Sequence, residues 1–313
     1  MADGWLMRPY AGDEDYWRLR AFLRQVYRLN HRQERSWPVC RWDCCHWHVY
    51  PTAGDGSPEA SVLLWEHNGA LIAAAISEGW GDVWLQVHPA WRDEALERTM
   101  VTAAEEHLSA PRGDGRALTV WAHADDPFRK GVLRARGYVR GQEPEYDWWR
   151  DLDDGPDDLF LAGLDVPEGY AVRSLGGPEE IPARSHLSWL AFSSGASDSL
   201  DPAWYAEQIQ RAPLYRRDLD LVAVAPDGSL AGFATVWFDD VNRSASFEPV
   251  GVAPGHRRRG VGRALMAEGL RRARSLGATR AHVGSFSPAA QALYVSVGFT
   301  RYLLAERWEK SWE

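Results

Sequence analysis

The feature that most constrains the fold is an internal repeat. The segment WLQVHPAWRDEALERTM at residues 84–100 aligns with PVGVAPGHRRRGVGRAL at residues 249–265, 165 positions later. A second pair of anchors, Gly137 in RARGY and Gly298 in VSVGF, repeats at 161 positions, so small insertions account for the drift. Self-similarity at a long, nearly constant offset indicates a duplicated domain.

Each half follows the same expected order: a strand, helices, a hairpin, a further strand, a helix, a strand and a final helix. The hairpins are marked by Asn68-Gly69 and Asp227-Gly228, which stand between apolar runs. Residues 151–168, DLDDGPDDLFLAGLDVPE, are acidic and suit a linker. We therefore expect a mixed-sheet α/β (α+β) fold with two tandem domains, at residues 1–150 and 169–313.

Composition narrows the classes of function. The 313 residues suffice for two domains, and 35 Lys and Arg against 44 Asp and Glu give a net charge of −9. An acidic chain disfavours nucleic acid as the partner. No apolar run reaches the ~18 residues of a membrane span, and three cysteines do not suggest a disulfide framework. We expect a cytoplasmic protein with no membrane partner.

A cysteine- and histidine-containing segment raises the question of a metal. Cys40, Cys44, Cys45, His46 and His48 lie among tryptophans in SWPVCRWDCCHWHVYP. Adjacent cysteines cannot easily both ligate one tetrahedral zinc ion. We therefore expect a packed loop or a wall of a substrate cleft, with no metal site.

The stretch at residues 255–277, GHRRRGVGRALMAEGLRRARSLG, joins a basic, glycine-rich corner to a helical pattern that ends at Gly277. A strand-like segment precedes it, in which Pro249 marks an edge, a bulge or a splay. A helix start after Gly260 presents unpaired N–H groups and a positive dipole end, which suit phosphate. A nucleic-acid patch and an ordinary solvated helix end are the alternatives. The Walker phosphate-binding pattern is absent.

The motif Arg257-x-x-Gly260-x-Gly262 resembles the R/Q-x-x-G-x-G/A signature of the GCN5-related N-acetyltransferase (GNAT) superfamily. The order of a strand, this corner, a helix and a further strand agrees with it. The later segment PAAQALYVSVGF is similar to the family's closing motif, with Tyr294 at its tyrosine. Ser287 stands where the family often has asparagine. The resemblance covers about residues 166–313.

The resemblance implies transfer of an acetyl group from acetyl-CoA to an amine by direct attack in a ternary complex, without a metal. It implies that Tyr294 serves the departing thiolate, and that Glu248 takes the amine proton, directly or through water. The Val250 N–H is the expected donor to the oxyanion. The expected acetyl-CoA-binding residues are Val250, Gly251, Val252, Arg257, Arg258, Arg259, Gly260, Val261, Gly262, Arg263, Ser287 and Ala290.

The first half lacks these elements at the aligned positions. Ala95 and Glu97 replace the two glycines, and Leu133 replaces the tyrosine. Carboxylates at this corner would face the position of a dianionic diphosphate, so we expect a degenerate GNAT-like domain. Its role in packing, in shaping the acceptor site or in forming a homodimer stays open.

The acceptor is the least determined part of the interpretation. A small-molecule amine is expected, with a peptide as the alternative. Residues 188–209 fall where the family places the helices over the acceptor, and this segment contains Ser193, Ser194, Asp198 and Trp204. The rival interpretation is a non-catalytic acyl-CoA-binding or scaffold protein in which both halves are degenerate.

Overall fold

The computed structural model describes residues 4–33, 35–52, 57–152, 163, 165–192 and 209–313. Contacts between residues divide the chain into two compact units. The N-terminal unit consists of Met1–Tyr146 together with Leu303–Glu313, and the C-terminal unit is Asp147–Tyr302. The last segment of the chain therefore belongs to the first unit. None of the helices in the described ranges is long and apolar enough to cross a membrane.

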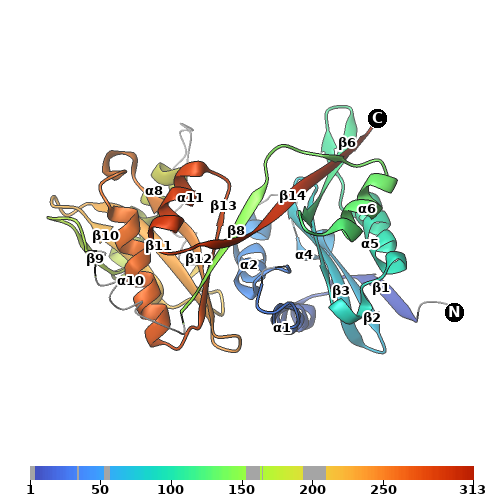
Figure 1. The fold of residues 1–313 in the computed structure, drawn as a ribbon, viewed down its shortest axis with the longest axis horizontal. Coiled ribbons are helices and arrows are strands. Elements are labelled where there is room, and N and C mark those ends of the chain that lie inside the picture. The colour runs from blue at the N-terminus through green and yellow to red at the C-terminus, as the bar shows by residue number, and fades with distance from the viewer. Residues whose placement is uncertain (1–3, 34, 53–56, 153–162, 164, 193–208) are drawn as a thin grey trace. The chain divides into compact units, whose positions relative to one another are not determined.

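The N-terminal unit is built on a mixed sheet with the strand order β1-β2-β3-β4-β6-β14 (Figure 1). Its strands are β1 (Trp5–Pro9), β2 (Val62–His67), β3 (Ala70–Gly79), β4 (Asp82–Val87), β5 (Ala110–Arg112), β6 (Gly115–His123), β7 (Val139–Arg140) and the start of β8 (Glu145–Asp151), joined by most of β14 (Arg301–Trp312). Its helices are α1 (Asp13–Leu29), α2 (Val39–Cys44), α3 (Tyr50–Thr52), α4 (Pro58–Ser61), α5 (Glu94–His107) and α6 (Pro127–Ala135). A π-helical turn covers Cys45–Val49, and a 3-10 turn covers Pro89–Trp91.

Two apolar clusters cover the two faces of this sheet. One includes Met100 of α5 and Leu133 of α6, which pack with Val120 of β6. The other includes Leu19 of α1 and Trp42 of α2. Side chains of a strand alternate between faces, so β2, β3, β4, β6 and β14 each contribute to both clusters.

Strand β14 pairs with β6 in antiparallel register from Ala305 opposite His123 to Trp312 opposite Arg116. Figure 1 shows β14, in red, beside β6 of the first half. A strand encoded at the end of the chain thus completes the sheet of the N-terminal unit. In the other direction, residues from Asp147 onward continue β8 into the C-terminal unit, where Leu152 N–H donates to Thr279 O over 2.9 Å.

The C-terminal unit has the strand order β9-β10-β11-β12-β13-β8. Its further elements are β9 (Ala171–Ser174), α8 (Ile181–Phe192), β10 (Asp220–Val224), β11 (Leu230–Asp239), β12 (Ser244–Val252), α10 (Val261–Ser275), β13 (Arg280–Ser285) and α11 (Pro288–Ser296). Within the described part of this unit, 3-10 turns lie at Pro178–Glu180, Arg217–Leu219 and Pro254–His256. Strand β9 pairs with β10, β10 with β11, and β11 with β12, all antiparallel, whereas β12 and β13 are parallel.

The expected mixed α/β architecture with two GNAT-like halves is confirmed at the level of fold. Both hairpins form: β2 pairs with β3 around Asn68-Gly69, and β10 pairs with β11 around Asp227-Gly228. The prediction that each half ends with a helix is wrong. Each half adds a closing strand, β8 and β14, whose charged residues and tryptophans hide the usual apolar alternation.

Candidate active site

The candidate site begins at an irregularity in strand β12. Ala234 of β11 pairs with Val250, but Val236 pairs with Phe247, so β12 carries one extra residue between these pairs. This β-bulge lies at Glu248 and Pro249, where proline supplies no donor to the ladder. Pairing of β12 with β13 is found only from Ser244 to Ser246. The segment Val250–Val252 therefore has its second edge available for a ligand.

The loop after β12 leads directly into α10. Gly260 is the N-cap of this helix, in the left-handed region with φ +85°, and no side chain caps the helix start. Gly262 follows in the first turn, where an added Cβ would lie 3.2 Å from Leu293 Cδ2. Main-chain N–H groups at the first turn thus stay available for an anion. The helix expected from the sequence is confirmed, and Gly277 follows its end with φ +93°.

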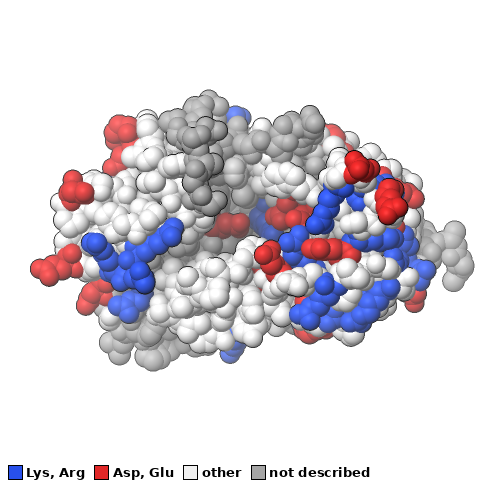
Figure 2. Space-filling view, turned by 90° about the horizontal axis from the view of Figure 1, so that it is seen from above, with Lys and Arg blue, Asp and Glu red and all other residues white. Residues whose placement is uncertain are grey.

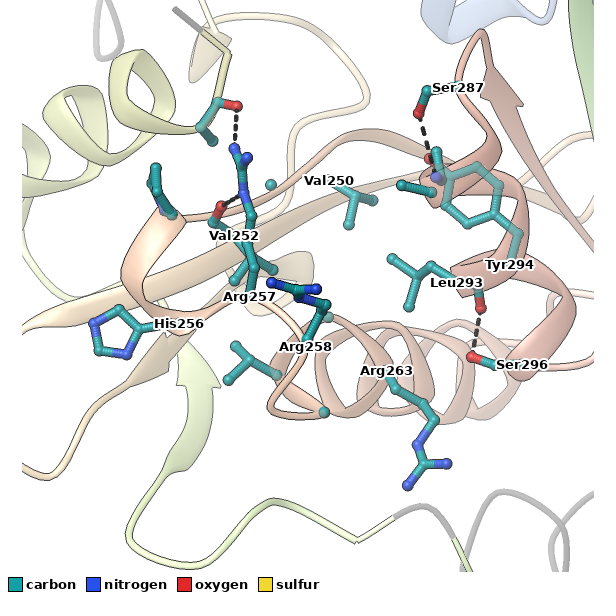
Figure 3. Close-up of a pocket in the computed structure, with 18 of the residues that line it drawn as sticks. Val250, Val252, His256, Arg257, Arg258, Arg263, Ser287, Leu293, Tyr294 and Ser296 are labelled. Carbon is teal, nitrogen blue, oxygen red and sulfur yellow. Dashed lines mark hydrogen bonds between the residues drawn. The ribbon is translucent and has the colours of Figure 1, made fainter.

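These elements enclose a pocket of about 1160 Å³. Its walls are Val250–Val252 of β12, the loop before α10, the first turn of α10, and α11 (Figure 3). Of the expected residues, those that line it are Val250, Gly251, Val252, Arg257, Arg258, Gly260, Val261, Gly262, Arg263, Ser287, Ala290 and Tyr294. Arg259 and Glu248 are exposed and do not line it.

The pocket lies on a basic part of an acidic protein. Figure 2 shows Lys and Arg side chains gathered in a patch on the C-terminal unit. Arg257, Arg258 and Arg263 line the pocket itself, together with His256. The imidazole of His256 shares a hydrogen bond of 2.9 Å with the hydroxyl of Tyr170. The charge at the pocket is therefore opposite in sign to the net charge of the chain, as an anionic ligand requires.

Tyr294 is buried on α11, with 6% of its surface exposed. Burial, with a smaller contribution from the negative charge of Glu248, raises the pKa of Tyr294 to about 12. The hydroxyl therefore holds its proton at neutral pH and can donate it. Glu248 is close enough to act on this pKa, and its carbonyl oxygen accepts a hydrogen bond from Trp237 Nε1.

The side chain of Arg257 makes two hydrogen bonds to the main chain. Its Nε donates to Val252 O over 3.1 Å, and its Nη2 donates to Ala191 O over 3.0 Å (Figure 3). The guanidinium therefore joins the end of β12 to the last turn of α8. Two of its donors are thus directed at main-chain carbonyls, while Arg257 still lines the pocket, and its part in binding acetyl-CoA stays a prediction.

Other lining residues were not among the expected ones. Ala191 and Phe192 come from α8, about sixty positions before the motif, and no local pattern could have identified them. Leu293 and Ser296 lie one turn apart on α11, and helical spacing around Tyr294 would have found them. Ser287 caps this helix, because its Oγ accepts from the Ala290 N–H over 3.3 Å.

The aligned corner of the N-terminal unit is built around a buried, paired carboxylate. Glu97 is fully buried, and its carboxylate pairs with Arg92 over 2.8 Å and with Arg129 over 2.9 Å. The expectation that Glu97 faces a ligand position is wrong, because two arginines bind it internally. Leu133 is also fully buried, in the core with Val120.

Two further segments that the sequence singles out are the acceptor segment and the cysteine-containing segment. Ser193, Ser194, Asp198 and Trp204 lie outside the described residues. Cys40 and Cys45 are buried and Cys44 is partly exposed, in α2 and the π-helical turn that follows it. Within the described ranges, no group of three His, Cys, Asp or Glu side chains is placed to hold a metal ion.

The fold, the bulged strand and the open helix start define an acyltransferase of the GNAT type. Comparison with known proteins agrees: the pattern of the "Acetyltransferase (GNAT) family" matches residues 183–299. A mycothiol acetyltransferase from Thermomonospora curvata is 30% identical, over 69% of each chain. Another from Kineococcus radiotolerans is 28% identical, over 80% of each chain. The chain belongs to the GNAT acetyltransferase family.

Solved structures support the tandem layout. A tandem GNAT protein from the clavulanic acid biosynthesis pathway superposes with a TM-score of 0.66, over 98% of both chains, at 20% identity. At this identity the likeness shows the fold alone.

Proposed function

We propose that this enzyme transfers the acetyl group of acetyl-CoA to the amine of a small-molecule acceptor, with both substrates bound together in the C-terminal unit. The observation that carries the proposal is one pocket that joins three parts: the open edge at Val250–Val252, the uncapped start of α10, and the buried hydroxyl of Tyr294. Acetyl-CoA is the donor that the GNAT family uses.

The donor fits the pocket in a definite direction. The N–H groups at Gly260 and Gly262 bind the diphosphate, because the helix start supplies both donors and a positive dipole end. The pantetheine arm lies along Val250–Val252 and uses the main-chain groups that β13 leaves unpaired. The thioester then lies near Tyr294, which stands at the opposite end of the pocket from His256 (Figure 3).

The reaction needs a nucleophile, an oxyanion donor and an acid. The neutral amine nitrogen attacks the thioester carbonyl carbon, and the C=O electron pair moves to the oxygen, where the Val250 N–H donates to it. Collapse of this intermediate breaks the C–S bond, and Tyr294 donates its proton to the departing sulfur. The proton lost by the amine passes to Glu248 through water, since this carboxylate lies outside the pocket wall.

The acceptor is proposed to be a small molecule, because the two relatives described above are named for mycothiol, a small molecule. A panel of small amines, aminoglycosides, polyamines and peptide N-termini, assayed for release of CoA, identifies the class. Release with peptides alone would contradict a small-molecule acceptor.

The role of Tyr294 is tested with Tyr294→Phe, which removes only the hydroxyl. We expect kcat to fall about 100-fold while KM for acetyl-CoA changes little, because the proton is needed in the transition state. Tyr302→Phe is the matched control: this tyrosine is exposed and packs on Trp148, away from the pocket. Wild-type kcat in Tyr294→Phe would remove the hydroxyl from the mechanism.

A further inference from the structure

The bulge in β12 is held by a side chain that no step of the proposed mechanism uses. The indole N–H of Trp237, on β11, donates to the carbonyl oxygen of Glu248. This carbonyl lies inside the bulge, where the regular pairing of β11 with β12 is interrupted. A side chain thus binds the main chain at the place where the register of the two strands shifts.

Trp237 is itself held by a polar network buried between α8 and the sheet. It is 3% exposed, and its ring packs edge-on against the ring of Tyr215, with the centroids 6.5 Å apart. The hydroxyl of Tyr215 donates to Asp220 Oδ2 over 2.9 Å, and Asp220 Oδ1 lies 3.9 Å from Nε of Arg184. Thr235 bridges this fully buried ion pair, because its Oγ1 accepts from Arg184 over 3.3 Å and donates to Asp220 over 3.4 Å. The network therefore leaves the indole little freedom to move.

The N-terminal unit packs the corresponding strand without such a network. Strand β3, like β11, follows the hairpin of its half, and its residues Ala74 and Ile76 lie in an apolar cluster with Leu19 of α1. Its ladder with β4 is regular from Ala73 to Ser77. A buried ion pair usually stabilises a fold no more than apolar side chains of similar volume would. The polar network occurs in the half that has the bulge, which indicates that it fixes the backbone there.

We infer that Trp237 is a positioning residue for acetyl transfer: by holding the Glu248 carbonyl, it directs the Val250 N–H at the thioester oxygen. This inference rests on the proposed function. Pro249 has no N–H, so the first main-chain donor after the held carbonyl is that of Val250. This donor acts on charge that develops in the transition state, and displacing such a group by about 1 Å is costly. Trp237 therefore acts on the reaction through the main chain and not by contact with a substrate.

Infrared spectroscopy of the full chain with acetyl-CoA, isotope-labelled at the thioester carbonyl, tests the inference without an acceptor. A hydrogen bond to this oxygen weakens the C=O bond, so we expect the band of the wild-type complex to lie below that of free acetyl-CoA. In Trp237→Phe the band should return toward the free value. Calorimetry should give an affinity for acetyl-CoA within about twofold of wild type, because the start of α10 is unchanged.

A second variant keeps the shape of the side chain. Site-specific replacement of Trp237 by benzothienylalanine retains the bicyclic ring and its contact with Tyr215, but puts sulfur in place of the N–H. The thioester band should shift as in Trp237→Phe. With an amine that the wild type acetylates, kcat should fall about tenfold or more, while KM for acetyl-CoA stays within about twofold.

The matched control is Trp148→Phe, which removes another buried indole N–H of the C-terminal unit. Its partner is Ser285 Oγ, at 3.1 Å, and neither residue lines the pocket. We expect this variant to keep the wild-type band and the wild-type affinity.

Three results would contradict the inference. A wild-type thioester band in the benzothienylalanine variant would overturn it and leave the proposed function intact. A loss of affinity for acetyl-CoA in that variant would also overturn it, because Trp237 would then shape the donor site as a whole. Failure of the wild type to bind acetyl-CoA would refute the proposed function and this inference with it.

Discussion

The start of α5 and the start of α10 occupy aligned positions in the two halves, and they are built in opposite ways. Asp93 caps α5, because its Oδ1 accepts from the Leu96 N–H over 2.8 Å. In α10 the N-cap is Gly260, and no side chain accepts from the first turn. The capped start uses its donors within the protein, whereas the open start keeps them for a ligand.

The buried positions of the two helices support this alignment. Buried residues of α5 fall 165 positions before buried residues of α10: Leu96, Glu97, Met100, Val101 and Ala104 correspond to Val261, Gly262, Leu265, Met266 and Gly269. The stripe that packs on the sheet is therefore shared. The two helices differ where a ligand would lie, at Glu97 and Gly262.

The strands that precede these two helices, β4 and β12, also differ. Strand β4 pairs with β3 without interruption from Val87 opposite Ala73 to Val83 opposite Ser77. Strand β12 contains its bulge within the corresponding stretch, near Pro249. The ladder between β3 and β4 thus has no bulge at the position where β12 is irregular, so the first half lacks this feature of the site as well as the open helix start.

Glu97→Gln should give the largest effect, on stability. The substitution leaves Arg129, which is 5% exposed, without its opposite charge. Breaking a buried ion pair in this way costs about 3 kcal/mol or more of the free energy of unfolding, measured by denaturant titration. The control is Glu94→Gln, at an exposed carboxylate on the same helix, with an expected change below about 0.5 kcal/mol.

Glu97→Gln should also change how the free energy of unfolding depends on pH. Burial tends to raise the pKa of Glu97, but Arg129 and Arg92 outweigh it and hold that pKa below its usual value. A depressed pKa in the folded state gives stability that is present above the unfolded pKa of about 4.3 and is lost as pH falls through the folded value. Glu97→Gln should weaken this acid-side loss. An unchanged acid limb would show that Glu97 is not the group responsible.

Gly262→Glu places the first half's residue in the second half without its arginine partners. The side chain would fill the space beside Leu293 and put a negative charge where the diphosphate binds. We expect affinity for CoA to fall about 100-fold or more, since like charges shielded from water repel strongly. Gly262→Gln separates volume from charge and should cost less, about tenfold. Wild-type affinity in Gly262→Glu would remove the diphosphate from this helix start.

The sequence predicted the parts of this site that depend on neighbours along the chain. The two hairpins and the helix after Gly260 rest on turn residues and apolar spacing, and all of them form. The position of Tyr294 in the pocket also follows from a local motif, although its catalytic role stays a prediction.

Long-range partners could not be predicted in this way. The carbonyl that accepts from Arg257 belongs to Ala191, 66 positions earlier, and the guanidinium that binds Glu97 belongs to Arg129, 32 positions later. The sequence does not indicate whether a charged residue is buried in an ion pair or exposed to solvent. The pairing of β14 with β6 is likewise set by tertiary packing, since strand partners leave no mark on local periodicity.

The smallest expected effect is that of the N-terminal unit on donor binding. With Asp93 capping α5, Glu97 filling the corner and Leu133 in place of a tyrosine, this unit offers a diphosphate no open helix start. Calorimetry should therefore give one CoA per chain, and Gly262→Glu should remove that single binding event. Ala95→Gly alone should add no second site, because Asp93 and Glu97 remain in place. Two CoA per wild-type chain would contradict the contrast between the two helix starts, since a capped and filled corner would then bind the same ligand as an open one.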